Sequence, residues 1–350
     1  MTRGLLVLCV LLAGAAPTSA EEPVKPWRVG VLYWSMQIPG QVAMREGLEA
    51  ELAALNAAAA KAGQRTVEPI VRVAGDGAPG IERQIAQMNE IVDLAVDLII
   101  VQPTDNAALV KPLARANAAG IPVVAYDQYI ARGDLASFLT SDNHQAGFLD
   151  GEYLASRFAD DHELRLVLVD YPHVSSTVER VNGLMDALKA AGQPFRVLAT
   201  FEAVEPVAGA KAGKAILAQF PEPGSVDAVF TVNDGGGLAV VDELAAAGRT
   251  EIVVATIDGD GKSVENILAG RLTGIDSAQF CGALGRETMK VGWRILHGES
   301  VPKAVLLPVF PITAETQALY RGWNQPTPEP FTKPWPSSKP VWSWELVERH

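Results

Sequence analysis

Polar and aromatic side chains follow the short apolar runs of this sequence, where each run ends. They are Tyr33, Trp34, Gln102, Thr104, Asp105, Asp127, Gln128, Asp170, Tyr171, His173, Asn233, Asp234 and Asp258. Carboxylates hold hydroxyl groups through charge-assisted hydrogen bonds, and aromatic rings pack against the faces of a solute. These residue types therefore predict the binding of a small, hydroxylated, mostly uncharged molecule.

Some of the same polar residues have a second interpretation as helix caps. Asp, Asn, Ser and Thr are common at the first position of a helix that follows a strand, where they accept hydrogen bonds from free backbone amides. We prefer this interpretation for Asp105, Asp142 and Asp234.

Patterns for catalysis or metal binding are weak. The five histidines are His144, His162, His173, His297 and His350, and their spacing matches no metal site. No G-x-S-x-G nucleophile turn occurs. The run IDGDGK around Asp258 resembles the start of a calcium loop, but the twelfth position, which must be acidic, is Ala269. We therefore expect no enzyme, no cofactor and no metal.

The elements that position these residues alternate between β-rich runs and Ala/Leu-rich helical patterns. The expected strands are Arg28–Trp34, Val67–Val73, Leu98–Val101, Val123–Tyr126, Leu164–Val169, Arg196–Phe201, Ala228–Val232 and Ile252–Ile257. The expected helices are Met44–Ala60, Gly80–Ala95 and Asn106–Ala119, with others starting near Ser176, Gly209 and Gly237. Alternation of this kind predicts parallel sheets flanked by helices, here as two doubly wound, Rossmann-like α/β lobes.

The two ends of the chain differ from this pattern. Residues 1–20 combine a positive start, an apolar run containing Cys9 and small residues before Glu21, which predicts a cleavable signal peptide and export to the periplasm. Residues 321–350 hold four of the seven tryptophans, at 323, 335, 342 and 344. Because Gln325–Pro340 is rich in proline, we expect no regular helix or strand there. This tail either packs on a lobe as a strap, which we favour, or binds a partner.

Charge and cysteine content exclude several classes. The formal net charge is −12, with no cluster of Lys and Arg, which argues against nucleic acid as a partner. After cleavage only Cys281 remains, so each lobe is held by packing rather than by an intrachain disulfide. We expect Cys281 to be a small buried side chain rather than a reactive thiol.

The order of motifs resembles the periplasmic sugar-binding proteins of the ribose- and galactose-binding type, which share their fold with LacI-like repressors. The resemblance lies in these stretches: PGQVAMREG, DLIIVQPTDNAALVKPL, ANAAGIPVVAYDQ, SDNHQAGFLDGEYLA, VDAVFTVNDGGGLAVVDEL and VVATIDGDGKSVENILAGRLTG. It implies a type 1 periplasmic binding fold, with lobe 1 at 28–140 plus 280–307, lobe 2 at 141–279 plus 308–320, and a Pro/Trp-rich tail at 321–350. Three hinge crossings are implied near Ser141, Gln279 and Pro308, and hinge motion closes the lobes on ligand.

The resemblance also implies ligand contacts at Asp127, Asn233, Asp258 and Gln279. The chain departs from the family at four other positions. Gly40 and Gln41 stand where ribose binders have stacking aromatics, Gln128 stands where arginine is common, and a helix-start arginine is replaced by Val178. Tyr33, Trp34, Tyr129, Tyr171 and His173 are the residues that could refill the pocket. The sequence therefore leaves a polyol, a modified sugar and a less polar solute as candidate ligands. The nine predicted ligand-binding residues are Tyr33, Trp34, Gln41, Asp127, Gln128, His173, Asn233, Asp258 and Gln279.

Two functional hypotheses follow. The first is solute capture for the membrane permease of an ABC importer, by a monomer. The second is a periplasmic ligand sensor that signals to a membrane histidine kinase or chemoreceptor. Only the tryptophan-rich tail favours the second, as a docking patch. A signal peptide in place of a DNA-binding domain argues against a repressor.

Overall fold

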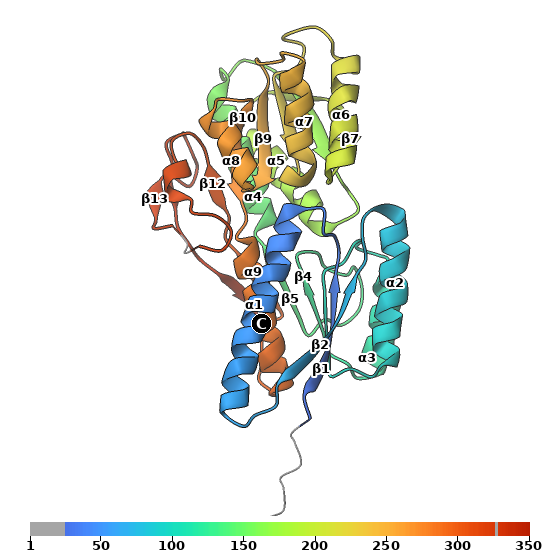
Figure 1. Cartoon of the computed structure of the whole chain (residues 1–350). Helices are drawn as coiled ribbons and strands as arrows, with labels where there is room; N and C mark the ends of the chain where they lie inside the picture. The colour runs from blue at the N-terminus through green and yellow to red at the C-terminus, as the bar shows by residue number, and fades with distance from the viewer. Residues whose placement is uncertain (1–24, 326–327) are drawn as a thin grey trace, which may run out of the picture.

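Two α/β lobes lie one above the other, joined by segments that run between them (Figure 1). The computed structural model describes residues 25–325 and 328–350. The predicted signal peptide, with Cys9, lies outside these residues. None of the helices described is long and apolar enough to cross a membrane.

The first lobe is built on a seven-stranded sheet. Its strands are β1 (Trp27–Tyr33), β2 (Val67–Val73), β3 (Leu98–Val101), β4 (Val123–Tyr126), β5 (Ser137–Ser141), β11 (Ala304–Leu307) and β15 (Val347–Arg349), in the order β15-β11-β5-β4-β3-β1-β2. All pairs are parallel except β11 with β15. Helices α1 (Pro39–Lys61) and α9 (Cys281–Leu296) pack on one face, and α2 (Gly77–Asp93) and α3 (Val110–Ala118) on the other.

The second lobe repeats this design with six strands. They are β6 (Leu164–Asp170), β7 (Phe195–Glu202), β8 (Ala228–Thr231), β9 (Val253–Asp258), β10 (Thr273–Ala278) and β12 (Phe310–Ile312), in the order β12-β10-β9-β8-β6-β7. Only β12 is antiparallel to its neighbour. Helices α4 (Asn143–Arg157) and α5 (Ser175–Ala190) cover one face, and α6 (Pro206–Gln219) and α7 (Asp234–Ala246) the other, while α8 (Gly261–Leu268) packs near β10. The predicted fold class of two doubly wound lobes is confirmed.

Three segments cross between the lobes where β5 leads to α4, β10 to α9, and β11 to β12. The crossings thus fall at Ser141–Asn143, Ala278–Cys281 and Leu307–Phe310. These are the places expected near Ser141, Gln279 and Pro308. They leave the sheets at the ends of β5, β10 and β11, on the same side of each sheet, and Gln279 of the second crossing lines the pocket between the lobes.

Helix α1 begins at Pro39, five residues before the predicted start at Met44. Proline is well tolerated at the first helical position, because that residue has no intrahelical amide bond to lose. Farther along α1, an ideal Cβ on Gly285 of α9 would lie 1.9 Å from the Met44 carbonyl oxygen. Glycine there lets the backbones of α1 and α9 touch, which fixes the first turns of α1 beside the second crossing.

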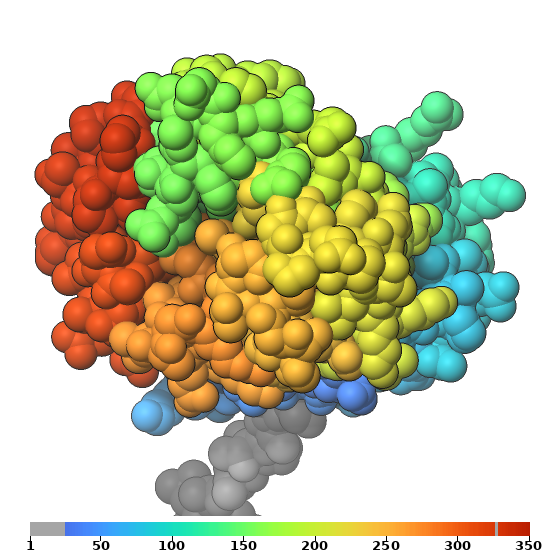
Figure 2. All heavy atoms as spheres, turned by 90° about the horizontal axis from the view of Figure 1, so that it is seen from above, coloured from blue at the N-terminus to red at the C-terminus, as the bar shows by residue number. Residues whose placement is uncertain are grey.

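The tail lies along one side of the molecule as a strap and returns to the first lobe, where β15 pairs with β11 (Figure 1). After the short 3-10 helix η1 (Gln317–Leu319), it forms β13 (Phe331–Thr332), β14 (Val341–Trp342) and β15. In the view from above, this red segment lies along one side of the molecule against the green surface of the second lobe (Figure 2). The expectation of no strand in Gln325–Pro340 was wrong at β13, whose two residues pair with β14 just beyond the proline-rich stretch.

The tryptophans of the strap pack inward. Trp335 joins the core of the second lobe, and the Trp342 indole Nε1 donates to the Val309 carbonyl oxygen at 2.6 Å. The Trp344 ring lies 4.9 Å from the ring of Phe280, centroid to centroid. Val309 and Phe280 belong to two of the crossings, so the strap lies directly on the connections between the lobes.

Candidate ligand-binding site

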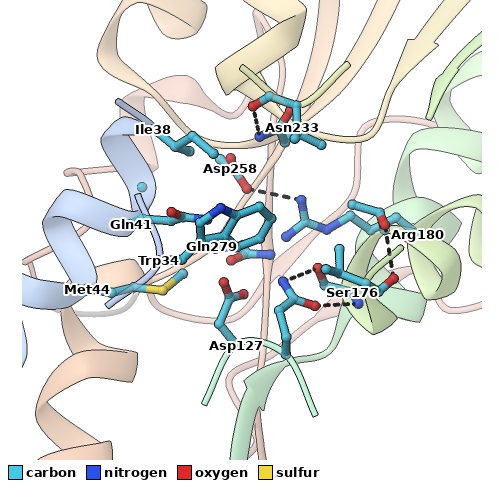
Figure 3. A pocket seen from close by; sticks show the side chains of 15 residues that line it. Trp34, Ile38, Gln41, Met44, Asp127, Ser176, Arg180, Asn233, Asp258 and Gln279 are labelled. Atoms are coloured by element: carbon cyan, nitrogen blue, oxygen red, sulfur yellow. Dashed lines mark hydrogen bonds and ion pairs between the residues drawn. The ribbon is translucent and has the colours of Figure 1, made fainter. Parts of the chain in front are cut away.

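A pocket lies between the lobes, and residues of both lobes line it (Figure 3). The space left open in it is about 30 Å³, well below the roughly 300–1,000 Å³ of sites that hold a small molecule, so the closed lobes leave little room between them. Seven of the nine predicted site residues line the pocket: Trp34, Gln41, Asp127, Gln128, Asn233, Asp258 and Gln279. All seven are buried.

Each lobe contributes the tips of its central strands and the first turns of its helices. From the first lobe, Trp34 follows β1, Gln41 and Met44 lie in the first turns of α1, and Asp127 and Gln128 follow β4. From the second lobe come Ser176, Thr177 and Arg180 of α5, Asn233 before α7, and Asp258 at the end of β9. The carboxyl ends of parallel strands are where α/β folds bind ligands.

Arg180 and Asp258 form a buried ion pair on the second-lobe side. Arg180 Nη1 donates to Asp258 Oδ1 at 3.2 Å and to the Val232 carbonyl oxygen at 2.6 Å, and its Nε donates to Asn143 Oδ1 at 2.9 Å. Gln279 Nε2 donates to the same Asn143 oxygen at 3.0 Å. This network fixes the guanidinium and the Gln279 amide at the edge of the pocket.

Asp127 and Asp258 both have left-handed backbone conformations, with φ of 65° and 134°. Non-glycine residues in this region carry strain and are concentrated at functional sites. Asp127 Oδ2 accepts from Gln102 Nε2 at 2.9 Å, and its carbonyl oxygen accepts from Thr140 Oγ1. Both carboxyl groups that line the pocket therefore belong to residues with an unusual backbone conformation.

The lobes contact each other beside the pocket, so the structure shows them closed. Gln128 Nε2 donates to Ser176 Oγ at 2.7 Å, and the Ser176 amide donates to Gln128 Oε1 at 3.0 Å (Figure 3). The Trp34 ring of the first lobe lies 6.3 Å from the Tyr171 ring of the second. A ligand in the pocket would be held from both sides.

Two predicted residues do not line the pocket. Tyr33 is the last residue of β1, and its side chain is in the core, where its hydroxyl lies 3.4 Å from Glu49 Oε1. Neighbouring residues of a strand point to opposite sides, so Trp34 faces the pocket instead. The His173 ring is half-exposed, 3.5 Å from Glu202 Oε2, and only its carbonyl oxygen binds the other lobe, at the Asn106 amide.

The cap of α7 is Asn233 rather than Asp234. Asn233 Oδ1 accepts from the Gly236 amide at 3.2 Å, and its Nδ2 donates to the Val204 carbonyl oxygen at 3.0 Å. Asp234, expected as a cap, instead accepts from Thr256 Oγ1 and the Asp260 amide beneath the pocket. Asp142 does cap α4, and Asp105 accepts from the Ala107 and Ala108 amides. Asn233 keeps one amide hydrogen for a ligand.

The sequence-based prediction missed several lining residues, chiefly Arg180. It placed the family's helix-start arginine on Val178, two residues before Arg180, and Val178 is partly exposed and does not line the pocket. The other missed residues are Ile38, Gly40, Met44, Val174, Ser176, Thr177 and Val204. An arginine among apolar positions in the first turns of a helix that follows a strand is a signal that could have found Arg180.

Cys281 is fully buried beside the pocket, and burial raises the pKa of its thiol far above the usual range. Thiolate formation, on which reactivity depends, is therefore suppressed. Within residues 25–325 and 328–350, no group of three or more His, Cys, Asp or Glu side chains is arranged to hold a metal ion.

A pair of buried carboxyls, Asp234 and Asp276, lies behind Asp258. Burial raises the pKa of Asp276 to about 8, and Asp276 Oδ1 accepts from the Gly259 amide at 2.9 Å. The folded protein therefore keeps this proton at pH 7, while the unfolded chain releases it near pH 4. The stabilising contribution of Asp276 is complete below pH 4 and is lost as pH rises to about 8.

We therefore expect Asp276→Asn to stabilise the protein at pH 8 but not at pH 4. The amide can accept from Gly259 without carrying charge, and the gain should be at least about 1.4 kcal/mol, the equivalent of one pKa unit. Urea unfolding at both pH values, with exposed Asp186→Asn as the control, measures it. Equal stability of Asp276→Asn and the parent at pH 8 would contradict this prediction.

Two α/β lobes that close on a pocket lined by buried polar groups from both sides define a binding protein of the type 1 periplasmic fold. The sequence matches the periplasmic binding protein domain family over residues 29–300. The chain belongs to this family. Its relatives are substrate-binding proteins, so this is a binding protein rather than an enzyme, and the family implies a periplasmic location.

Individual relatives agree with this assignment. The ribose import binding protein RbsB of Bacillus subtilis (strain 168) is 25% identical over 314 residues, which cover 87% of this chain and 96% of that protein. A xylitol-binding protein of Mycolicibacterium smegmatis is 26% identical over 277 residues, covering 77% and 72%. The structure of an ABC transporter solute binding protein from Mycobacterium smegmatis with bound glycerol has a TM-score of 0.73 and 22% identity over 87% of this chain and 99% of that one.

Proposed function

We propose that this protein captures a small polyhydroxylated solute, a sugar or a polyol, and delivers it to the membrane permease of an ABC importer. The main support is the pocket, where Asp127, Gln128, Asn233, Asp258 and Gln279 present hydrogen-bonding groups from both lobes. Such groups bind hydroxyls, and Trp34 offers a ring face to the carbon skeleton. Relatives named for ribose and xylitol support this class of ligand.

Export by a cleavable signal peptide at residues 1–20 and action as a monomer are parts of this proposal. We favour import over sensing. The tail was the only feature that supported a sensor, as a patch on which a receptor could dock. Its Trp335 and Trp342 side chains are buried against the protein and are not available to a receptor.

The proposed site can be tested by removing single polar groups. We expect Asp258→Ala or Asn233→Ala to lower affinity for the captured solute by about 1–3 kcal/mol, because a buried partner is left without its hydrogen bond. Mass spectrometry of the solute that co-purifies with the full chain identifies the ligand, and calorimetry measures the loss. Asp186→Ala, exposed and outside the pocket, is the control. Unchanged affinity in both pocket variants would refute the site.

Import can be separated from sensing in cells. Deletion of the gene should abolish uptake of the identified solute while leaving behavioural and transcriptional responses to it intact. Loss of a response with uptake unchanged would favour the sensor.

A further inference from the structure

Three charged side chains line the pocket: Asp127, Arg180 and Asp258. The Arg180 and Asp258 side chains are only 4% and 9% exposed, and they pair with each other. The pocket therefore holds two carboxyls and one guanidinium, and the guanidinium donates to Asp258 rather than to Asp127, so an ionised Asp127 has no cation bonded to it. Burial of an uncompensated charge is costly unless a partner of opposite sign arrives.

Asp127 receives neutral donors but no cation. Its Oδ2 accepts from Gln102 Nε2, and the ion pairs of the described residues include Asp258 but not Asp127. Gln128 directs its amide to Ser176 of the other lobe. Arg180 acts on Asp127 only at a distance across the pocket, and among the described residues no cation lies within ion-pair distance of Asp127.

The carboxyls behind the pocket supply no cation to Asp127. Asp150, Asp234 and Asp276 are buried behind Asp258 in the second lobe, and burial raises the pKa of all three, which favours their uncharged acid forms. Burial also raises the pKa of Asp127 and brings that of Asp258 to about 8, so a cation bound beside Asp127 would favour its charged form.

The pocket also offers an aromatic face. In the view of Figure 3, Asp258 lies above the Trp34 ring and Asp127 below it. Tryptophan is the best aromatic partner of an ammonium group, and the attraction increases when water is excluded. A carboxylate without a cation beside a buried indole is a combination that suits a positively charged amine.

We infer that the ligand is a hydroxylated solute bearing one protonated amine, an amino sugar or amino polyol, whose ammonium group binds Asp127. This inference rests on the proposed function and refines the expectation of an uncharged ligand. The hydroxyls would bind the amides of Gln128, Asn233 and Gln279, while Arg180 remains paired with Asp258.

Matched pairs of compounds test this inference with the full chain. The amines are glucosamine, galactosamine and 1-amino-1-deoxyglucitol, and their neutral parents are glucose, galactose and glucitol. Thermal shift and calorimetry at pH 7 should show at least one amine binding ten or more times more tightly than its parent. In Asp127→Asn, which keeps the shape of the side chain, that preference should disappear, while Asp186→Asn keeps it.

The outcomes separate the inference from the proposed function. Neutral parents that bind as tightly as the amines, or a preference for amines that survives Asp127→Asn, would overturn the inference and leave capture of a polyhydroxylated solute standing. Binding of no compound in either form would overturn the inference and count against the proposed function as well.

Discussion

Arg180→Met should destabilise the protein by about 3–5 kcal/mol and abolish ligand binding. The guanidinium is 4% exposed and donates to Asn143, Val232 and Asp258. Removing the guanidinium leaves these three buried oxygens without their donor, and each unsatisfied buried acceptor costs about 1–3 kcal/mol. Chemical unfolding at pH 7 measures the first effect, and calorimetry with the identified solute measures the second.

The cost of Arg180→Met relative to the parent should increase with pH only above about pH 8. The pKa of Asp258 in the folded parent is already about 8, so parent and variant both hold this proton below that pH. Without the guanidinium the pKa rises further, so above pH 8 the variant continues to lose stability after the parent has stopped. Arg180→Met/Asp258→Asn removes both charges and should recover part of the loss. A cost relative to the parent that is the same at pH 7 and pH 9.5, with no recovery in the double variant at the higher pH, would show that the pairing of Arg180 with Asp258 is not the cause.

The two-lobed fold was predictable because its signals are local. Apolar runs such as DLIIV and IPVVAY produce strands buried on both faces, and the helical patterns between them produce parallel sheets. The polar residues at the strand tips followed from the same reasoning, since the carboxyl ends of parallel strands meet on one edge. Asp127, Asn233 and Asp258 line the pocket because they stand at such strand ends.

The missed features depend on information that is not local. Tyr33 and Trp34 are adjacent, and a shift of one residue in the strand end decides which of them faces the pocket. Strand β15 forms because the tail returns to the free edge of β11, a pairing across about forty residues that composition does not show. Asp234 was predicted to cap α7, but its neighbour Asn233 holds the cap position. Both residue types are good caps, so the sequence does not distinguish them.

Lys333→Met should release the strap and destabilise the protein by about 3–5 kcal/mol if the strap unfolds with the lobes. Lys333 Nζ lies 2.7 Å from Glu152 Oε2, and both side chains are about 95% buried, with exposures of 4% and 5%. Glu152 also accepts from the hydroxyls of Ser337 and Ser338, so one carboxylate of α4 anchors the middle of the tail. Loss of the cation leaves Glu152 charged and buried among neutral donors.

The comparison that isolates this ion pair uses Lys339→Met and the double variant Lys333→Met/Glu152→Gln. Lys339 is exposed on the same strap, so its replacement should leave stability unchanged within about 0.5 kcal/mol. The double variant removes the stranded charge and should be more stable than Lys333→Met alone. Because Trp342 and Trp344 of the strap lie on Val309 and Phe280 of the crossings, release should also increase proteolysis at 321–350. A strap as resistant to protease in Lys333→Met as in the parent would mean that its aromatic contacts, rather than this pair, hold it in place.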